Sequence, residues 1–266
     1  MPRIIRNTLL NYIPNEFKIE KTINPLRVFE VNDKSKTGKT LVYLCEREIR
    51  IKDNFALKFA IQKSNELALA LKIIHPQIVY EHKSKQIFIN QQILQVQKMF
   101  REVNIDFGIV PSNNILEFIN KLNPAILIVD FNPIINRGWM KGLTCKIYEI
   151  DGHNIIPARF VSNKQEYSAS TLRSKIYRNI YSFLTEFENI TEEKNEADYV
   201  LEDFIKNKLP YYAEFKNHPD KNLTSGLSKY LNLGFISSQR VAIEAIKTEA
   251  SDINKEAFLE ELIVRK

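Results

Sequence analysis

Residues 125–150 read AILIVDFNPIINRGWMKGLTCKIYEI, and they indicate the fold class. Residues 125–129 are all apolar, and Asp130 follows them directly; residues 145–150 form a second strand-like run. Apolar runs without polar alternation are typical of parallel strands that are covered on both faces. Ligands of such sheets bind beyond the carboxyl ends of the strands, so Asp130 lies at the edge where a ligand is expected.

Similar segments precede this stretch. Strand-like runs occupy residues 41–45, 71–75 and 107–110, and residues 53–71, 87–103 and 113–122 have the apolar spacing of helices. Asp53 is the expected N-cap of the first helix. Because strands and helices alternate, we predict an α/β domain with a Rossmann-like, doubly wound parallel sheet over residues 40–184.

The flanking regions differ in character. Residues 1–39 are expected to form an irregular N-terminal arm, and residues 185–203 an acidic linker that is partly helical. Residues 204–266 carry only helical signals, with Ser237 as an expected N-cap. The last helix, predicted for residues 254–266, has no stop signal, so we expect an incomplete helical domain.

Composition narrows the classes of function. The 266 residues carry a net charge of +6, which permits nucleic-acid binding without demonstrating it. Cys45 and Cys145 lie in apolar runs and are expected to be buried thiols, and the four histidines share no spacing typical of metal ligands. No apolar run is long enough to span a membrane. We therefore expect a monomeric, cytoplasmic protein without a metal.

Five ordered blocks carry a resemblance to a known family. DGHNIIPARFVSNKQEYSASTLRSKI (151–176) resembles the signature of the class II cyclobutane pyrimidine dimer photolyases. EREIRIKDNFAL (46–57), IVDFNPIINRGWMK (128–141), YYAEFKNHPDKNLTSGLSKYLNLGFISSQRVAI (211–243) and FLEELIVRK (258–266) are similar to further blocks of that family, in the same order. The resemblance runs from about residue 27 to the end of the sequence.

The resemblance implies a fold and an activity. Photolyases have an α/β antenna domain followed by an all-helical FAD-binding domain. As deoxyribodipyrimidine photo-lyases, they repair UV-damaged DNA with light: excited, reduced FAD gives an electron to a pyrimidine dimer that is flipped out of the duplex. The family therefore implies FAD as cofactor and damaged DNA as partner, and it leaves the antenna chromophore open.

The family motifs also imply site residues. Tyr212 matches a tyrosine at the flavin, Glu261 an acidic residue that faces the lesion bases, and Arg265 an arginine on the DNA-facing helix. A loop that approaches the FAD phosphates matches Thr224, Ser225, Gly226, Leu227 and Ser228. Hydroxyls and backbone N–H groups at the start of a helix suit an anion, which supports this assignment.

The chain also departs from the family. Glu48, Phe55, Lys229, Asn232 and Leu233 replace characteristic residues, and the single tryptophan, Trp139, lies in the α/β part. Family members continue beyond the matched region with further flavin contacts and a tryptophan relay. We therefore expect a truncated fragment that is inactive on its own and holds no stoichiometric FAD, unless a separately encoded C-terminal half completes it.

Two other functions remain open from the sequence. One is a non-catalytic α/β module that binds a nucleotide or an antenna chromophore, although no G-x-G-x-x-G fingerprint is present. The other is a general basic nucleic-acid-binding protein, for which a dense basic patch with interleaved aromatics is missing. His153, inside the signature stretch, is expected to be a hydrogen-bonded structural histidine.

Overall fold

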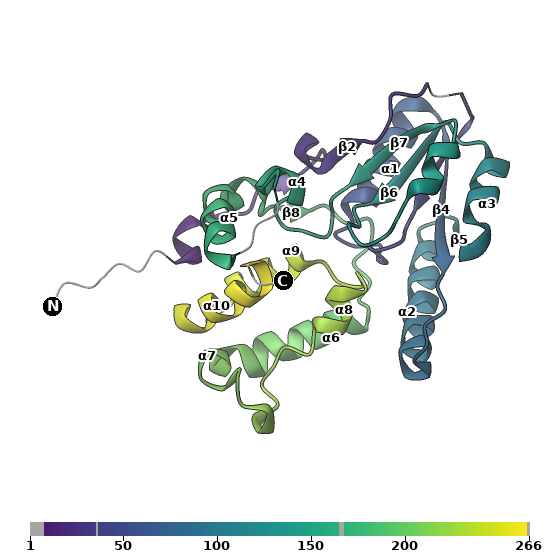
Figure 1. Ribbon diagram of the computed structural model, residues 1–266. Coiled ribbons are helices and arrows are strands. Elements are labelled where there is room, and N and C mark those ends of the chain that lie inside the picture. The colour runs from purple at the N-terminus through teal and green to yellow at the C-terminus, as the bar shows by residue number, and fades with distance from the viewer. Residues whose placement is uncertain (1–7, 36, 165–167, 265–266) are drawn as a thin grey trace.

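A computed structural model describes residues 8–35, 37–164 and 168–264. Its centre is a six-stranded sheet in the order β2-β7-β6-β3-β4-β5 (Figure 1), parallel except for β2. The order reverses at β3, because β4 and β5 extend the sheet in one direction and β6 and β7 in the other. The strands are β2 (Val28–Glu30), β3 (Thr40–Leu44), β4 (Ala70–Gln77), β5 (Phe107–Pro111), β6 (Ile126–Asp130) and β7 (Lys146–Ile150).

The predicted α/β architecture is confirmed, and the apolar runs explain it. Both faces of β6 are covered, since Leu127 and Val129 pack in one cluster with α3 while Ile126 and Ile128 pack in another with α1 and α2. Continuous apolar strands gain from burial on both sides. The helices of this part are α1 (Phe55–Leu67), α2 (Lys83–Glu102), α3 (Ile115–Leu122), α4 (Ala158–Val161) and α5 (Ala169–Phe183).

One predicted helix cap was wrong and another is confirmed. Helix α1 is capped by Asn54, whose side chain accepts a hydrogen bond from the Leu57 N–H, and not by Asp53. Asp53 has a positive φ of 49° and forms an ion pair with Arg240 at 2.8 Å. Ser237 caps α9 (Ser238–Lys247), as predicted.

The N-terminal arm and the acidic segment are more ordered than expected. Strand β2, within the supposedly irregular arm, extends the sheet by antiparallel pairing with β7. A second sheet joins the same two regions, because β1 (Ile19–Glu20) pairs in parallel with β8 (Glu186–Phe187). Helix α6 (Glu196–Asp203) starts inside the acidic segment, at a capping box formed by Asn195 and Asp198.

The described C-terminal part consists of helices joined by turns, and it packs below the sheet in the view of Figure 1. It continues from α6 through a π-helical segment (Phe204–Lys208) and ends in another (Glu260–Val264). Between these lie α7 (Tyr212–Phe215), α8 (Ser228–Asn232), α9 and α10 (Asp252–Leu259). The predicted C-terminal helix of residues 254–266 is therefore a shorter α-helix followed by a π-helical turn, and residues 265–266 lie outside the description.

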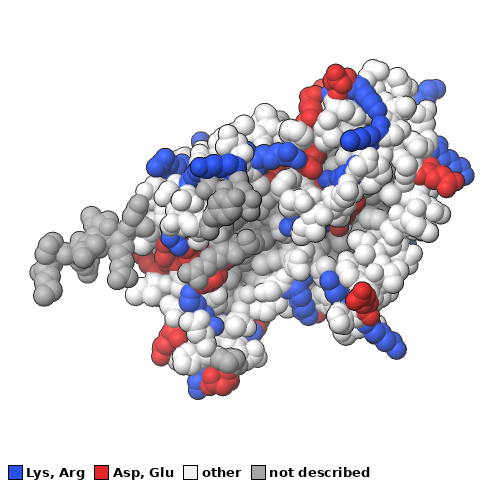
Figure 2. Space-filling model, viewed as in Figure 1, with Lys and Arg blue, Asp and Glu red and all other residues white. Residues whose placement is uncertain are grey.

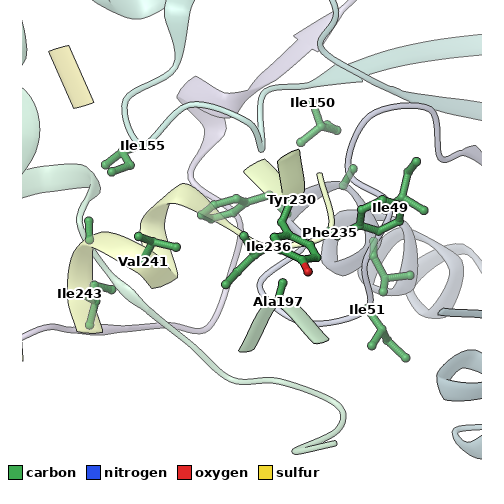
Figure 3. Packing of buried hydrophobic residues seen from close by; sticks show 14 of the residues in the cluster. Ile49, Ile51, Ile150, Ile155, Ala197, Tyr230, Phe235, Ile236, Val241 and Ile243 are labelled. Carbon is green, nitrogen blue, oxygen red and sulfur yellow. The ribbon is translucent and has the colours of Figure 1, made fainter. Parts of the chain in front are cut away.

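One hydrophobic cluster joins the two parts of the chain. Figure 3 shows Phe235 and Ile236 of the helical part together with Ile49, Ile51 and Ile155 of the α/β part. All five side chains are buried. The helical part is thus stabilised by contact with the α/β part, while the domain boundaries drawn from the sequence stay predictions.

Three smaller observations concern the described ranges. Cys45 and Cys145 are buried free thiols, as expected from their apolar surroundings. No helix in these ranges combines the length and the apolar character that a membrane span needs. Nor do they bring together three or more His, Cys, Asp or Glu side chains suited to holding a metal ion.

Candidate functional site

A cavity of about 410 Å³ lies between the α/β part and the helical part. Its volume falls within the range of ligand sites, which is roughly 300–1,000 Å³. Four of the residues chosen from the sequence line it together, namely Tyr212, Ser225, Ser228 and Glu261. The rest of the wall is formed by Arg47, His153, Asn154, Leu231, Asn232, Phe258 and Leu262.

Tyr212 begins helix α7 and is positioned by aromatic packing. Its ring meets Phe204 and Phe258 edge-on, with centroid separations of 5.8 and 5.3 Å. Burial, followed by the negative charge of Glu261, raises the pKa of the phenol. Among the described residues the hydroxyl has no hydrogen-bond partner, although the side chain is buried and lines the cavity. A buried phenol usually finds a partner, so this hydroxyl is suited to contact a ligand.

The loop predicted to approach phosphates divides between cavity and core. Ser225 and Ser228 line the cavity, and the Ser225 hydroxyl accepts a hydrogen bond of 3.3 Å from the Leu227 N–H. Leu227 is fully buried and serves packing. Gly226 allows the turn with a positive φ of 68°, and Thr224 is exposed and outside the cavity wall. The structure therefore brings only the two serines of this motif to the cavity.

Glu261 lies on the C-terminal π-helical segment. Its carboxylate forms an ion pair with Lys216 at 2.9 Å, and about a third of the side chain is exposed. The pair leaves a charged and partly accessible group at the rim of the cavity. Arg265, the predicted DNA contact, lies outside the described residues.

Asp130 is used inside the protein and does not face a ligand. Its Oδ2 accepts hydrogen bonds from the backbone N–H groups of Glu46, Arg47 and Glu48 at 2.9, 2.8 and 3.0 Å, and the Tyr43 hydroxyl donates to Oδ1 at 2.7 Å. Successive N–H groups of this kind form an anion-binding concavity, which the carboxylate fills. The expectation of a ligand at Asp130 was thus wrong. Burial, with the charge of Glu48 second, raises the pKa of Asp130 to about 6.

A buried ionic network supports the cavity wall. Glu48 forms an ion pair with Arg50 and lies 3.1 Å from His153 Nδ1. Arg50 also donates from Nη1 to the Gly234 carbonyl at 3.0 Å, which ties the loop after β3 to the helical part. His153 is buried, as expected for a structural histidine, and in addition it reaches the cavity.

Arg47 and Asn154 were not selected from the sequence. Both lie inside blocks that carry the family resemblance, 46–57 and 151–176, and membership of these blocks was the sequence feature that could have indicated them. Their place on the wall depends on the docking of the helical part against the α/β part. The spacing of side chains along the sequence does not indicate a contact between two distant parts of the chain.

Two further cavities contain none of the predicted residues. One of about 410 Å³ lies between residues 154–176 and the segment 262–264, with mostly apolar walls. The other, of about 250 Å³, lies between α2 and the C-terminal end of β4, beside β5, and is lined by His75, Tyr80, Ile93 and Ile109, among others. His75 Nδ1 donates to the Cys45 carbonyl at 2.7 Å, and burial lowers the pKa of this imidazole. The ring is therefore neutral and keeps Nε2 as an acceptor.

Comparison with solved structures defines the class of fold. The chain is similar to a bacterial class III photolyase from Agrobacterium tumefaciens, with a TM-score of 0.63 over 88% of this chain and 59% of that one. The sequence identity is 15%, so this likeness establishes the fold alone. It agrees with the α/β sheet followed by helices.

Comparison with curated proteins gives the particular relatives. The chain is 26% identical to a deoxyribodipyrimidine photo-lyase of Arabidopsis thaliana, 24% to one of Potorous tridactylus and 25% to one of Methanothermobacter thermautotrophicus. These matches cover 85 to 86% of this chain but only 57, 52 and 60% of the relatives. No family model matches the chain. At this low identity, the relatives support the photolyase family.

Proposed function

We propose that the chain is part of a class II cyclobutane pyrimidine dimer photolyase, a deoxyribodipyrimidine photo-lyase that acts on UV-damaged DNA. The observation that carries the proposal is the cavity between the two parts of the chain. Tyr212, the serine pair Ser225 and Ser228, and Glu261 come from three segments, were selected by resemblance, and line the same space. The names of the curated relatives support the same activity.

The cavity residues fit a flavin nucleotide. The serine hydroxyls suit phosphate oxygens, the Tyr212 hydroxyl has no partner among the described residues, and Phe258 offers an apolar wall. Reduced FAD in this place would supply, when illuminated, the electron that splits a pyrimidine dimer. The chain's own residues would bind the cofactor, exclude water through the aromatic wall, and present Glu261 to the bases of the lesion.

The size of the cavity sets the strength of binding that we expect. At about 410 Å³ it is at the small end of ligand sites, whereas FAD is a large dinucleotide. The chain also spans little more than half the length of its relatives. We therefore propose that further flavin contacts come from sequence that corresponds to the unmatched part of the relatives, supplied by the same polypeptide or by a separate one.

Absorption spectroscopy of the purified chain tests the proposal. Titration with FAD should show weak, saturable binding that Ser225→Ala and Ser228→Ala weaken further, with no repair of dimer-containing DNA by this chain alone. Stoichiometric FAD retained through purification, together with repair, would contradict the proposal of an incomplete site. Absence of any saturable flavin binding would contradict the flavin function itself.

DNA as the partner rests on the charge of one face. Figure 2 shows a row of Lys and Arg side chains across the upper left of the molecule, over the region of α4 and α5. Exposed basic residues in this region are Arg159, Lys164 and Arg178. Cations so placed bind phosphates with an affinity that falls as salt rises. If all three are replaced by Gln, the affinity for dimer-containing DNA should fall less steeply as the salt concentration rises.

A second candidate function is an α/β module that binds an antenna chromophore. The cavity beside His75 favours it, because it adjoins the carboxyl end of β4, and the carboxyl edge is the side of α/β sheets on which ligands usually bind. A nucleotide is disfavoured at the point where the strand order reverses, because the Asp130 carboxylate already occupies the backbone N–H groups there. A chromophore that copurifies with the chain and is lost in His75→Leu, while flavin affinity is unchanged, would support this function.

A further inference from the structure

Backbone contacts hold Arg47 in place, and its guanidinium keeps N–H donors for another role beyond the one that binds the Phe131 carbonyl. Its N–H donates to Asp130 at 2.8 Å, and its carbonyl lies against Gly234. Arg47 lines the cavity between the two parts of the chain, and its guanidinium donates a hydrogen bond to the Phe131 carbonyl at 3.3 Å. In the described ranges it has no ion-pair partner.

The neighbouring acidic groups already have their own cations. Glu46 pairs with Arg137, Glu48 with Arg50, and Glu261 with Lys216. These ion pairs leave the charge of Arg47 uncompensated by the acidic side chains next to it in the loop and across the cavity. Arginine presents five N–H donors in a planar fork, which matches the oxygens of a phosphate.

The other polar groups on the cavity wall add donors to this arginine. The Ser225 and Ser228 hydroxyls, the Tyr212 hydroxyl and the Asn232 amide line the same space. Several donors around one arginine suit an anion with many acceptor oxygens better than they suit a single carboxylate.

We infer that Arg47 is a binding residue for a phosphate or diphosphate group in this cavity, contributed by the α/β part. The inference deepens the proposed flavin function, since it assigns a residue outside the helical part to the anionic portion of the ligand. It also gives a reason for the docking of the two parts, because the anion would bridge them.

Calorimetry with inorganic pyrophosphate, FAD and riboflavin tests this assignment on the 266-residue chain. Arg47→Gln should weaken pyrophosphate and FAD binding by about tenfold or more, since a charge-assisted hydrogen bond is lost. Riboflavin, which lacks phosphate, should bind the parent protein and Arg47→Gln with the same affinity. Arg47→Lys should restore part of the affinity for pyrophosphate. Arg101→Gln, the same charge change at an exposed position on α2, should have no effect.

The outcomes separate this inference from the flavin proposal. Pyrophosphate binding that depends on Arg47, without flavin binding, would sustain the inference and refute the flavin function. FAD binding that is unchanged in Arg47→Gln would sustain the flavin function and refute the inference about Arg47. A chain that binds neither pyrophosphate nor FAD would refute both. Circular dichroism of Arg47→Gln checks that the fold is intact, which is expected because the backbone of Arg47 contacts Asp130 and Gly234, and the side chain adds one hydrogen bond of 3.3 Å, to the Phe131 carbonyl.

Discussion

Gly234 approaches the backbone of Arg47 so closely that a Cβ on Gly234 would lie 1.6 Å from the Arg47 carbonyl oxygen. The φ of Gly234 is 74°, which adds strain for any other residue. This contact joins the loop after β3 to the turn before α9. The docking of the helical part therefore depends on the absence of a side chain at residue 234.

Gly234→Ala should strongly destabilise the protein. To relieve this clash, the Arg47 carbonyl or the turn that carries the Arg50 hydrogen bond to Gly234 must shift, so we expect a loss of at least about 3 kcal/mol in the free energy of unfolding. Urea unfolding followed by circular dichroism measures it. Gly142→Ala is the matched control, because a Cβ there meets no atom within 4 Å. Equal stability of the two variants would contradict the close contact.

The buried ion pair of Glu48 and Arg50 should be sensitive to loss of one partner. Arg50→Met leaves the Glu48 carboxylate buried near Asp130, and removing one member of a buried pair costs about 3–5 kcal/mol. Lys194→Met, which breaks the exposed pair with Glu202, should change stability little. Thermal unfolding of both variants is the measurement. A small effect of Arg50→Met would show that Glu48 becomes neutral or reaches water.

Asp130 should make stability depend on pH in a defined window. Its pKa is raised from 3.8 to about 6, so between these values the folded protein keeps a proton that the unfolded chain has released. The free energy of unfolding contributed by this group is therefore greatest below pH 4 and falls as the pH rises through 6, by up to about 3 kcal/mol.

Asp130→Asn isolates this contribution, because an amide can accept the same N–H groups without titrating. The stability of the Asn variant relative to the parent protein should rise between pH 4 and pH 7. Urea titrations at four pH values across this range provide the test. A constant difference between the two proteins would mean that the hydrogen bonds to Oδ2 outweigh burial and keep the carboxylate charged.

The sequence predicted those features that depend on local pattern. The apolar run before Asp130 predicted β6, and Ser237 was recognised as a cap because its side chain binds N–H groups within the next turn. Asp53 and Asn54 are both good capping residues, and only the positive φ of Asp53 decides between them. Strand β2 escaped prediction because three residues are too short to show a pattern.

The candidate site was predictable only where resemblance supplied it. Tyr212, Ser225 and Ser228 were found through family motifs, while Asp130 was misjudged because its partners, the N–H groups of residues 46–48, come from a distant segment. Arg47 was missed for a related reason, since its place depends on how the helical part docks. Long-range packing, and not local periodicity, decides which polar groups remain available to a ligand.

Tyr212→Phe should separate ligand binding from stability. The hydroxyl has no partner among the described residues, so its removal should change the free energy of unfolding by less than about 0.5 kcal/mol. If the hydroxyl contacts the flavin, FAD affinity should fall by about threefold to tenfold. Tyr230→Phe is the matched control, because its hydroxyl donates to Glu196 at 2.7 Å and lies outside the cavity wall. It should lose about 1 kcal/mol of stability and keep its FAD affinity. If FAD affinity were unchanged in Tyr212→Phe and reduced in Tyr230→Phe, the flavin would have to bind outside this cavity.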